Sequence, residues 1–427
     1  MKKIFLKLLI LLLFLVGCQS PVVQDLSDFD ELLQYKKPFL LPTESLDLEI
    51  TSPSEEELEK LAEFREPRNV ELKTSKKLIR EDLQDLKWML ETAYSRYPLF
   101  DKEFEAAFEA IIDEVPATGS DRGSLAALMR KHFLFNRDYH FTIDGHYTNI
   151  RLPNVYDLDN SYHLEGNVAT HTETKEILDT TEFLEPFLLE DGEVVYKQVN
   201  RTNVKSPYSE YYVKAESLNL EVPYFHFNDF ETQSLDFNRF ATRIRNEKIA
   251  VIDLRNNSGG DQFYPASWIT LLTGRKIKHS FGGYMRQSPQ SSNYVVNGLI
   301  VAYLAGVPRD GYYEFKPSEK VLPHSGLLIV LQNSETVSAG ELLIDYLHHV
   351  ENTLFIGTPT KGSLSSNIVE GPVYLKNTGI GITFGNMATL FNPNYFKEEV
   401  GFSPDLYVLD KDMQSVIESL LMKLSTE

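Results

Sequence analysis

The sequence predicts an α/β fold, on two observations. From about residue 218 onward, a strand-like run at Val222–Phe227, a helix-like segment at Leu235–Asn246 and a second apolar run at Ile249–Arg255 follow one another. Two further apolar runs, Leu327–Leu331 and Leu354–Ile356, surround another helix-like segment. Strands that alternate with helices in this way imply an α/β core. We expect this core to span residues 216–427.

A small helical unit is expected before the core, over residues 76–145. Apolar residues recur there at helical spacing in three blocks, which prolines and glycines separate. The blocks run from Ile79 to Tyr97, from Phe104 to Val115 and from Leu125 to Phe133. The unit ends in Asn136–Ile143, which alternates like a strand.

Two other segments have a more polar composition. Residues 18–75 are acidic and contain several prolines, so we expect a tether that its own charge repulsion extends. Residues 146–215 are polar, with weak strand signals at Gly192–Val199 and at Tyr211–Ala215. This middle segment has no Gly-Leu-Gly-type loop of the kind that binds carboxylates in PDZ domains.

The N-terminus has the pattern of a targeting signal. Lysines at positions 2, 3 and 7 precede or enter an apolar run from Leu8 to Val16, which is too short for a comfortable transmembrane helix. The run ends in Leu15-Val16-Gly17-Cys18, which resembles the bacterial lipobox. The resemblance implies a signal peptide over residues 1–17, lipid on Cys18, and a protein anchored to a membrane on the extracytoplasmic side of the cell envelope.

Composition excludes several classes of function. The formal net charge of -20 and the absence of a Lys/Arg cluster argue against nucleic acid as a partner. Cys18 is the only cysteine, so there is no intramolecular disulfide and no thiol nucleophile or cysteine metal site. No metal-ligand spacing and no phosphate-binding loop are present, and we therefore expect neither metal nor cofactor.

The segment Leu328–Leu347 brings a serine to the start of a helix directly after an apolar strand. Backbone N–H groups of a first helical turn, with the positive end of the helix dipole, suit an oxyanion that forms at an attacked carbonyl. Ser338 is therefore a candidate nucleophile. The alternative is structural, because Ser338 and Glu341 also match a capping box.

A second motif is Asp253-Leu-Arg-Asn-Asn-Ser-Gly-Gly260, a strand that runs into paired glycines. Adjacent glycines allow backbone conformations that other residues avoid, and they let an N–H group point into a cavity. A plain turn is the alternative interpretation.

Four motifs in order resemble those of the tail-specific, or C-terminal processing, serine peptidases. They are the DLRNNSGG loop, the VSAGE helix start at 337–341, the GTPTKG turn at 357–362 and GFSPD at 401–405. The resemblance covers residues of about 78–145 and 216–410. It implies a crotonase-like catalytic core with a small N-terminal helical domain, and a peptidase that acts on polypeptides.

The resemblance also implies site residues. Ser338 matches the nucleophile, and the N–H of Ala339 with that of Gly259 or Gly260 matches the oxyanion hole. One branch of the family has a Ser-Lys dyad, in which the lysine directly follows the glycine of the turn. Here a serine follows that glycine, and Lys361 lies two residues earlier.

The other branch resembles the core peptidase of tricorn, with a histidine from the helical domain and a late glutamate. Asp138-Tyr-His140 and Glu398 fall at the matching places, although Tyr139 replaces the serine before the histidine in tricorn. A neutral imidazole can accept the proton of a serine, and a carboxylate fixes the imidazole tautomer. Glu399 and Glu370 are further candidates for the carboxylate.

Three hypotheses of function follow. The first is a serine peptidase with Ser338 as nucleophile, His140 as base and Glu398 as orienting carboxylate. The second is a Ser338/Lys361 dyad peptidase. The third is a catalytically inactive lipoprotein that binds peptides in the same cleft. The substrate and the oligomeric state do not follow from the sequence.

Overall fold

The computed structural model describes residues 29–42, 53–67, 73–148, 154–178, 183–201, 215–230, 234–277, 279–286, 312–315 and 317–426. The expected signal peptide and Cys18 lie outside these residues. Among the described helices, none combines the length and the apolar character that a membrane span requires.

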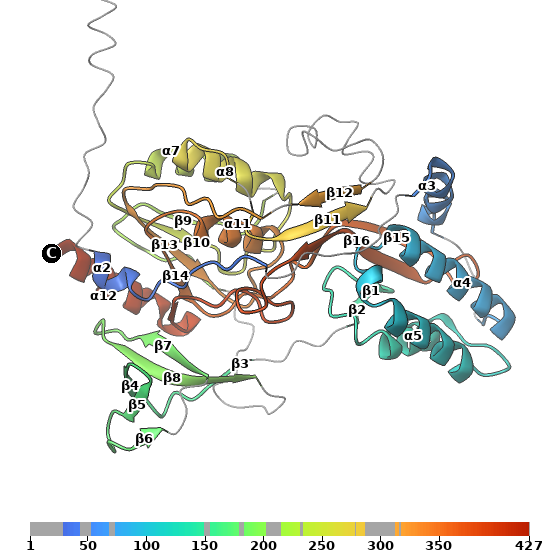
Figure 1. Ribbon diagram of the computed structural model, residues 1–427, viewed down its shortest axis with the longest axis horizontal. Helices are drawn as coiled ribbons and strands as arrows, with labels where there is room; N and C mark the ends of the chain where they lie inside the picture. Colours follow the sequence, from blue (N-terminus) through green and yellow to red (C-terminus); the bar gives the residue numbers. More distant parts are fainter. Residues whose placement is uncertain are drawn as a thin grey trace, which may run out of the picture.

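A parallel sheet forms the centre of the α/β core (Figure 1). Its three central strands, β10, β13 and β14, are buried along their whole length, as expected for a sheet covered on both faces. In spatial order they are β9 (Tyr224–His226), β10 (Ile249–Asp253), β13 (Leu327–Gln332), β14 (Thr353–Gly357) and β17 (Leu406–Tyr407). The α/β fold class predicted from the sequence is thus observed.

Helices cover both faces of this sheet. Alternate strand residues, such as Ile252 and Val330, pack with α7 (Ser234–Ile244), α8 (Phe263–Thr273) and α11 (Ala339–His348). The intervening residues, such as Val251 and Ile329, pack with α12 (Met413–Thr426) and the short α2 (Asp30–Leu33). A 3-10 turn, η4 (Asp410–Asp412), leads into α12.

The middle segment continues the core sheet. Its strand β7 pairs in parallel with β17 through Phe187 and Tyr407, and β8 lies beside β7. The strands are β3 (Asn154–Tyr156), β4 (Tyr162–Glu165), β5 (Val168–His171), β6 (Ile177–Leu178), β7 (Leu184–Leu188) and β8 (Val194–Arg201). The weak signal at 192–199 therefore marks β8, whereas most of the expected strand at 211–215 lies outside the described residues.

The helical unit packs against a second sheet, at the right of Figure 1. Its helices are α4 (Lys76–Ala93), α5 (Asp101–Glu114) and α6 (Arg122–His132), with the 3-10 turn η3 (Tyr97–Leu99). The sheet contains β1 (Thr142–Ile143), β2 (His146–Tyr147), β11 (Gly282–Arg286), β12 (Tyr312–Phe315), β15 (Ser366–Tyr374) and β16 (Gly381–Leu390). Ile382 and Phe384 of β16 share one hydrophobic core with the helices.

The expected tether is revised in its described parts. Phe29 is buried in the core beneath α12, and the backbone N–H of Lys37 donates to the Asp405 carboxylate at 2.6 Å. Residues 55–65 form α3 (Glu55–Ala62) and η2 (Glu63–Arg65), which pack on the helical unit. Acidic composition indicated solvent exposure, but apolar residues spaced between the charges make these contacts.

The segment predicted as a strand at 136–143 is mainly a turn. The backbone N–H of Asn136 donates to the Phe133 carbonyl, and that of Phe141 donates to the Asp138 carbonyl, both at 3.0 Å. Only Thr142 and Ile143 pair with β16. The alternation fails because the polar side chains of this segment are buried rather than facing solvent.

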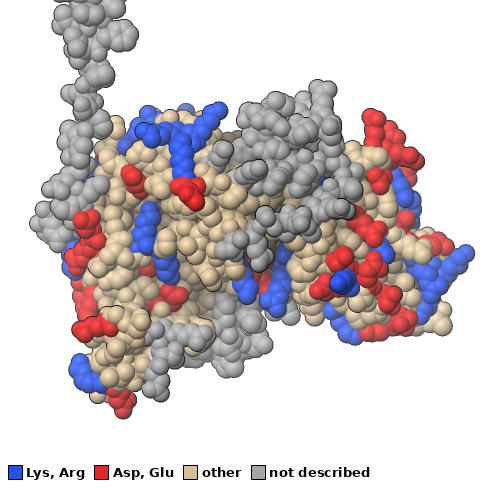
Figure 2. Space-filling model, viewed as in Figure 1, with Lys and Arg blue, Asp and Glu red and all other residues tan. Residues whose placement is uncertain are grey.

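Charged side chains of both signs cover the face shown in Figure 2. Asp and Glu side chains over the helical unit are interspersed with Lys and Arg. No broad basic surface is visible among the described residues of this face.

Candidate active site

Ser338 lies between β13 and α11, beside the glycine loop that follows β10. The two strands are parallel neighbours, so their carboxyl ends meet at one edge of the sheet. The Thr336 hydroxyl donates to the Leu254 carbonyl at 2.8 Å, and the backbone N–H of Val337 donates to the Asn257 carbonyl at 3.0 Å. These bonds hold the serine turn against the glycine loop.

The backbone of Ser338 has φ 55° and ψ -117°, a conformation that residues other than glycine rarely adopt. Such a backbone costs on the order of 1–3 kcal/mol and persists only where its surroundings hold it. The Glu341 carboxylate accepts from the Ser338 N–H at 3.1 Å. It also accepts from the backbone N–H groups of Gly362 and Ser363, at 2.7 and 2.8 Å. One buried carboxylate thus holds both the serine and the GTPTKG turn.

The Ser338 hydroxyl lies near the imidazole of His140. The distance from Ser338 Oγ to His140 Nε2 is 3.4 Å, although the two residues are 198 positions apart in the chain. The other ring nitrogen, Nδ1, lies 3.7 Å from an Asp138 carboxylate oxygen, and the His140 backbone N–H donates to the same oxygen at 2.8 Å. Among the described groups, Nδ1 has no hydrogen-bond partner.

Asp138 is fully buried and is held on its other side by the Tyr94 hydroxyl, which donates to it at 2.8 Å. Burial lowers the pKa of His140 below its ordinary value, and Arg96 acts in the same direction, while Asp138 opposes both. The imidazole is therefore neutral at neutral pH, which is the form that accepts a proton. Sequence reasoning did not assign Asp138, although it lies two residues before His140.

Glu398 lies in the same region, where its carboxylate binds backbone N–H groups. Its carboxylate accepts from the N–H groups of Tyr139, Leu364 and Ser365, at 3.3, 3.2 and 2.9 Å. Burial, and then the neighbouring Asp138, raise the pKa of Glu398 to about 8, while Arg96 lowers it. Its hydrogen bonds therefore hold the backbone next to His140, whereas Asp138 is the carboxylate within ion-pair distance of the ring.

The glycine loop, which contains Gly259 and Gly260, lies directly against Ser338. Gly259 and Gly260 have φ of 84° and 118°, and a Cβ on Gly259 would lie 2.9 Å from the Ser338 Cβ. The Gly259 N–H donates to the Asn257 side chain at 3.0 Å. In the described part of the chain, the N–H groups of Gly260 and Ala339 have no such acceptor. Of the expected donors, these two are the pair left for an oxyanion.

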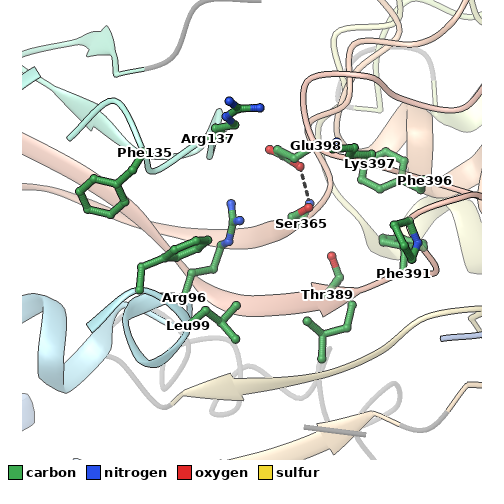
Figure 3. Close-up of a pocket in the computed structure, with 13 residues that line it drawn as sticks. Arg96, Leu99, Phe135, Arg137, Ser365, Thr389, Phe391, Phe396, Lys397 and Glu398 are labelled. Atoms are coloured by element: carbon green, nitrogen blue, oxygen red, sulfur yellow. Dashed lines mark hydrogen bonds between the residues drawn. The ribbon is translucent and has the colours of Figure 1, made fainter. Parts of the chain in front are cut away.

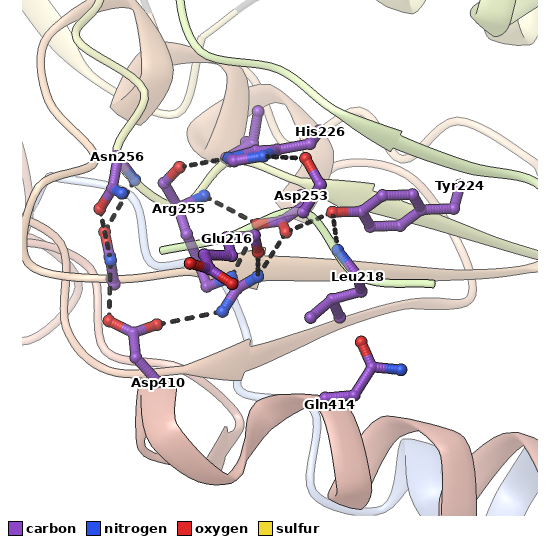
Figure 4. Close-up of polar contacts among 12 residues, drawn as sticks. Glu216, Leu218, Tyr224, His226, Asp253, Arg255, Asn256, Asp410 and Gln414 are labelled. Atoms are coloured by element: carbon purple, nitrogen blue, oxygen red, sulfur yellow. Dashed lines mark hydrogen bonds and ion pairs between the residues drawn. The ribbon is translucent and has the colours of Figure 1, made fainter. Parts of the chain in front are cut away.

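A network behind the glycine loop fixes the end of β10 (Figure 4). The Arg255 guanidinium donates to Asp253 from Nε at 2.9 Å and from Nη2 at 2.7 Å, and the Tyr224 hydroxyl donates to the same carboxylate at 2.8 Å. Asp410, before α12, lies 3.4 Å from Arg255 Nη1. Asp253 and Arg255 of the motif thus stabilise the end of β10 and the start of the glycine loop.

Lys361 has other contacts. Its ammonium lies 3.6 Å from a Glu335 carboxylate oxygen and 5.8 Å from the centre of the Tyr139 ring. Among the described residues, no hydrogen bond joins the Lys361 ammonium to Ser338.

A pocket of about 380 Å³ adjoins Glu398 (Figure 3). Its walls come from the helical unit, from Ser365 just before β15, and from the segment between Thr389 and Glu398. Of its lining residues, the sequence motifs pointed only to Glu398, because the walls come from four distant segments. The described residues contain no cluster of three or more side chains that could hold a metal ion.

Residues 221–408 match the model of peptidase family S41. No curated protein matches the chain in sequence. Solved structures with a similar chain path include mature CPAF complexed with lactacystin, with 11% identity over 82% of this chain and 99% of that chain, and a TM-score of 0.49. A putative peptidase from Parabacteroides merdae has 13% identity over 81% and 96% of the two chains, with a TM-score of 0.42. The tricorn protease has 15% identity over 82% of this chain and 37% of its own, with a TM-score of 0.43.

The matched range begins just before β9 and ends after β17, so it contains the strands β9, β10, β13, β14 and β17, the glycine loop and the Ser338 turn. His140 and Asp138 lie outside it, in the helical unit. The matched range is less than half of the chain, and within it the chain is similar to peptidase family S41, which supports a serine peptidase.

Proposed function

We propose that the protein is a serine endopeptidase of the bacterial cell envelope, in which Ser338 attacks the peptide bond and His140 is the base. The observation that carries the proposal is the 3.4 Å approach of Ser338 Oγ to His140 Nε2. Such contacts are often long without substrate and shorten in the reacting complex. The neutral imidazole and the strained serine backbone also support it.

The proposed reaction is an acyl transfer to Ser338 followed by hydrolysis. Ser338 Oγ bonds to the substrate carbonyl carbon while its proton moves to His140 Nε2, and the N–H groups of Ala339 and Gly260 stabilise the oxyanion. The imidazolium then gives that proton to the leaving amine as the peptide bond breaks. A water molecule, deprotonated by His140, hydrolyses the acyl-enzyme and restores Ser338.

Asp138 replaces Glu398 as the orienting carboxylate in this proposal. The support is its 3.7 Å distance to His140 Nδ1 and its burial, which favour the imidazolium that forms during the reaction. Glu398 then positions the backbone of Tyr139 and the turn that begins at Leu364.

Labelling with a fluorophosphonate, read by intact mass, tests the nucleophile and the base. We expect the wild type and Lys361→Ala to form the adduct, and Ser338→Ala and His140→Ala to lose it. Hydrolysis of a quenched peptide should fall by about 10⁴-fold or more in the latter two variants. A Lys361→Ala protein that is unreactive while His140→Ala reacts would support the dyad instead. A wild type that binds peptide without turnover or labelling would support the inactive peptide-binding protein.

We also propose that Cys18 carries the lipid that anchors the protein. The lipobox-like sequence before it is the support. Metabolic labelling with a fatty acid should mark the wild type and leave Cys18→Ser unmarked. Equal labelling of both proteins would contradict the anchor without affecting the proposed chemistry.

A further inference from the structure

Residues 29–42 lie against the α/β core, and we call this segment the strap (Figure 1). The sequence predicted that it would be part of an extended tether. At its start, however, Phe29 is buried in the cluster that contains α12. Near its end, Phe39 and Leu40 pack against the cluster that contains α11. The strap is therefore part of the folded body, eleven positions and more after the proposed lipid anchor at Cys18.

The strap contacts the C-terminal end of α11, the helix that begins after Ser338. The ring of Phe39 stacks on that of His349, with the two centroids 4.2 Å apart. The Lys36 ammonium donates to the Val350 carbonyl at 2.9 Å. These two contacts fix the strap to the turn that follows the helix.

The strap also binds both ends of the segment that carries Glu398. At one end, the side-chain amide of Asn392 donates to the Leu41 carbonyl at 3.0 Å. At the other end, the backbone N–H of Lys37 donates to the Asp405 carboxylate at 2.6 Å. Asn392 is 8% exposed and Asp405 is fully buried, so little water competes for either bond. Glu398 lies between these two points in the chain.

Asn392 also orders the turn that leads to Glu398. Its side-chain oxygen accepts from the Asn394 N–H at 3.0 Å. Its backbone carbonyl accepts from the N–H groups three and four residues later, at 2.9 and 3.0 Å. Glu398 follows directly after this turn and accepts from the N–H of Tyr139, the residue before His140. One amide thus joins the strap to the turn that places Glu398.

We propose that the strap is a positioning element of the active site, which holds Asn392 and Asp405 and thereby fixes Glu398 and the backbone beside His140. The proposal rests on the function proposed above. A base must lie within hydrogen-bond reach of its nucleophile, so a small displacement of His140 from Ser338 slows the proton transfer. The segment that leads from the lipid anchor to the body then serves catalysis as well as attachment.

Asn392→Asp, in the full-length chain, tests the contact with Leu41. The variant keeps the oxygen that accepts from Asn394 and replaces the donor to the Leu41 carbonyl with a second oxygen. We expect kcat for a quenched peptide to fall by about tenfold, with little change in KM, in a folded protein. Asn219→Asp, at an exposed site, is the matched control and should keep the wild-type kcat. A folded Asn392→Asp protein with wild-type kcat would overturn the proposal.

Two variants of Phe39 supply a second test, because a new carboxylate at a buried position can prevent folding. Phe39→Ala removes the ring that stacks on His349 and should lower kcat by about threefold or more in the folded protein. Phe39→Tyr keeps the ring and should retain most of the wild-type kcat. Equal kcat in the two folded proteins would contradict a positioning role for the strap.

A double-mutant cycle separates positioning from a general effect on stability. Asn392→Asp is measured in the wild type and in a Glu398→Ala protein. Because the strap acts through Glu398 in this proposal, the change should lower kcat by less than about threefold once Glu398 is absent. The same loss in both backgrounds would show that the strap and Glu398 act independently, contrary to the proposal.

Hydrogen exchange separates this proposal from the proposed function, because it needs no turnover. It is measured on Ser338→Ala with and without Asn392→Asp, in peptides that contain Tyr139 or Ser365, whose N–H groups donate to Glu398. We expect Asn392→Asp to raise exchange there by about fivefold or more, and to leave β10 unchanged. Faster exchange, in a protein whose wild type neither cleaves nor labels, would support the strap and contradict the peptidase chemistry. Cleavage by the wild type with unchanged exchange in the variant would contradict the strap alone.

Discussion

Asp138 and Glu398 are two buried carboxylates that contact the same short segment through different groups. Asp138 faces the His140 ring and its N–H, whereas Glu398 binds backbone N–H groups from two chain segments. Both lie near Arg96, whose positive charge acts on the pKa of His140 and of Glu398. The site therefore assigns orientation of the ring to one carboxylate and placement of the backbone to the other.

Amide variants of the two carboxylates test this division. Asp138→Asn should lower kcat by about 10²- to 10⁴-fold, because an amide does not stabilise the imidazolium. Glu398→Gln should have a smaller effect, since an amide oxygen can still accept from Ser365. Steady-state kinetics on folded variants measures both. A larger loss in Glu398→Gln would return the orienting role to Glu398, as the family resemblance first implied.

The raised pKa of Glu398 predicts a pH dependence of stability. The ordinary pKa of 4.5 applies to the unfolded chain, and the folded value is about 8. Between these values the folded state holds a proton that the unfolded state lacks. The contribution to stability is therefore present below the unfolded pKa and is lost as pH rises through the folded pKa.

Urea unfolding of the wild type and Glu398→Gln at pH 5.5 and 8.5 measures this effect. The wild type should lose more free energy of unfolding between the two pH values than Glu398→Gln does. Titrating groups that do not interact with Glu398 are common to both proteins, so their effects cancel in the comparison. Parallel pH dependence of the two proteins would contradict the raised pKa.

At the scale of elements, the start of α11 is fitted closely to the glycine loop. A Cβ on Gly340 would lie 2.7 Å from Asn257 Oδ1 and 3.2 Å from the Thr336 side chain. The same Asn257 oxygen accepts from the Gly259 N–H. The second helical residue thus fixes the loop that carries the proposed oxyanion donor Gly260.

Gly340→Ala should lower kcat by about tenfold with little change in KM, because Asn257 must move and release the glycine loop. Its effect on stability should be smaller, since alanine favours a helix by about 1 kcal/mol over glycine. Gly123→Ala on α6 is the control, because a Cβ there makes only an ordinary contact with Asp121 at 3.5 Å. Unchanged kcat in folded Gly340→Ala would refute the coupling.

At the scale of the whole molecule, the site forms only when the helical unit docks on the core. The unit shares its hydrophobic core with β15 and β16, which continue from the core after the Ser338 helix. Asp82 on α4 accepts from the backbone N–H groups of Asn377 and Thr378, at 2.9 and 2.7 Å, and from both side chains. This buried carboxylate joins the helical unit, which carries His140, to the turn between β15 and β16.

Asp82→Ala should lower the free energy of unfolding by about 3 kcal/mol or more, because it leaves buried donors without an acceptor. It should also slow fluorophosphonate labelling of Ser338, since His140 is then held less firmly. Asp113→Ala, at an exposed position of α5, is the control and should change neither quantity. Loss of stability with full labelling rate would show that docking and site geometry are independent.

The sequence by itself determined the features that depend on neighbouring residues. Hydrophobic periodicity placed α4 and α7 and the strands β10 and β13 to within a few residues, because each element exposes its own repeat. The serine at the start of α11 and the paired glycines after β10 were also found from adjacent residues in the sequence.

Only the tertiary structure decided which distant groups meet. The approach of His140 to Ser338, the position of Asp138 against the ring, the pairing of Lys361 with Glu335 and the pocket around Arg96 all depend on packing between separate parts of the chain. The pairing of β7 with β17 joined the middle segment to the core sheet in the same way. A single sequence records local periodicity, but these contacts arise from the burial of shared apolar surfaces, which no local pattern specifies.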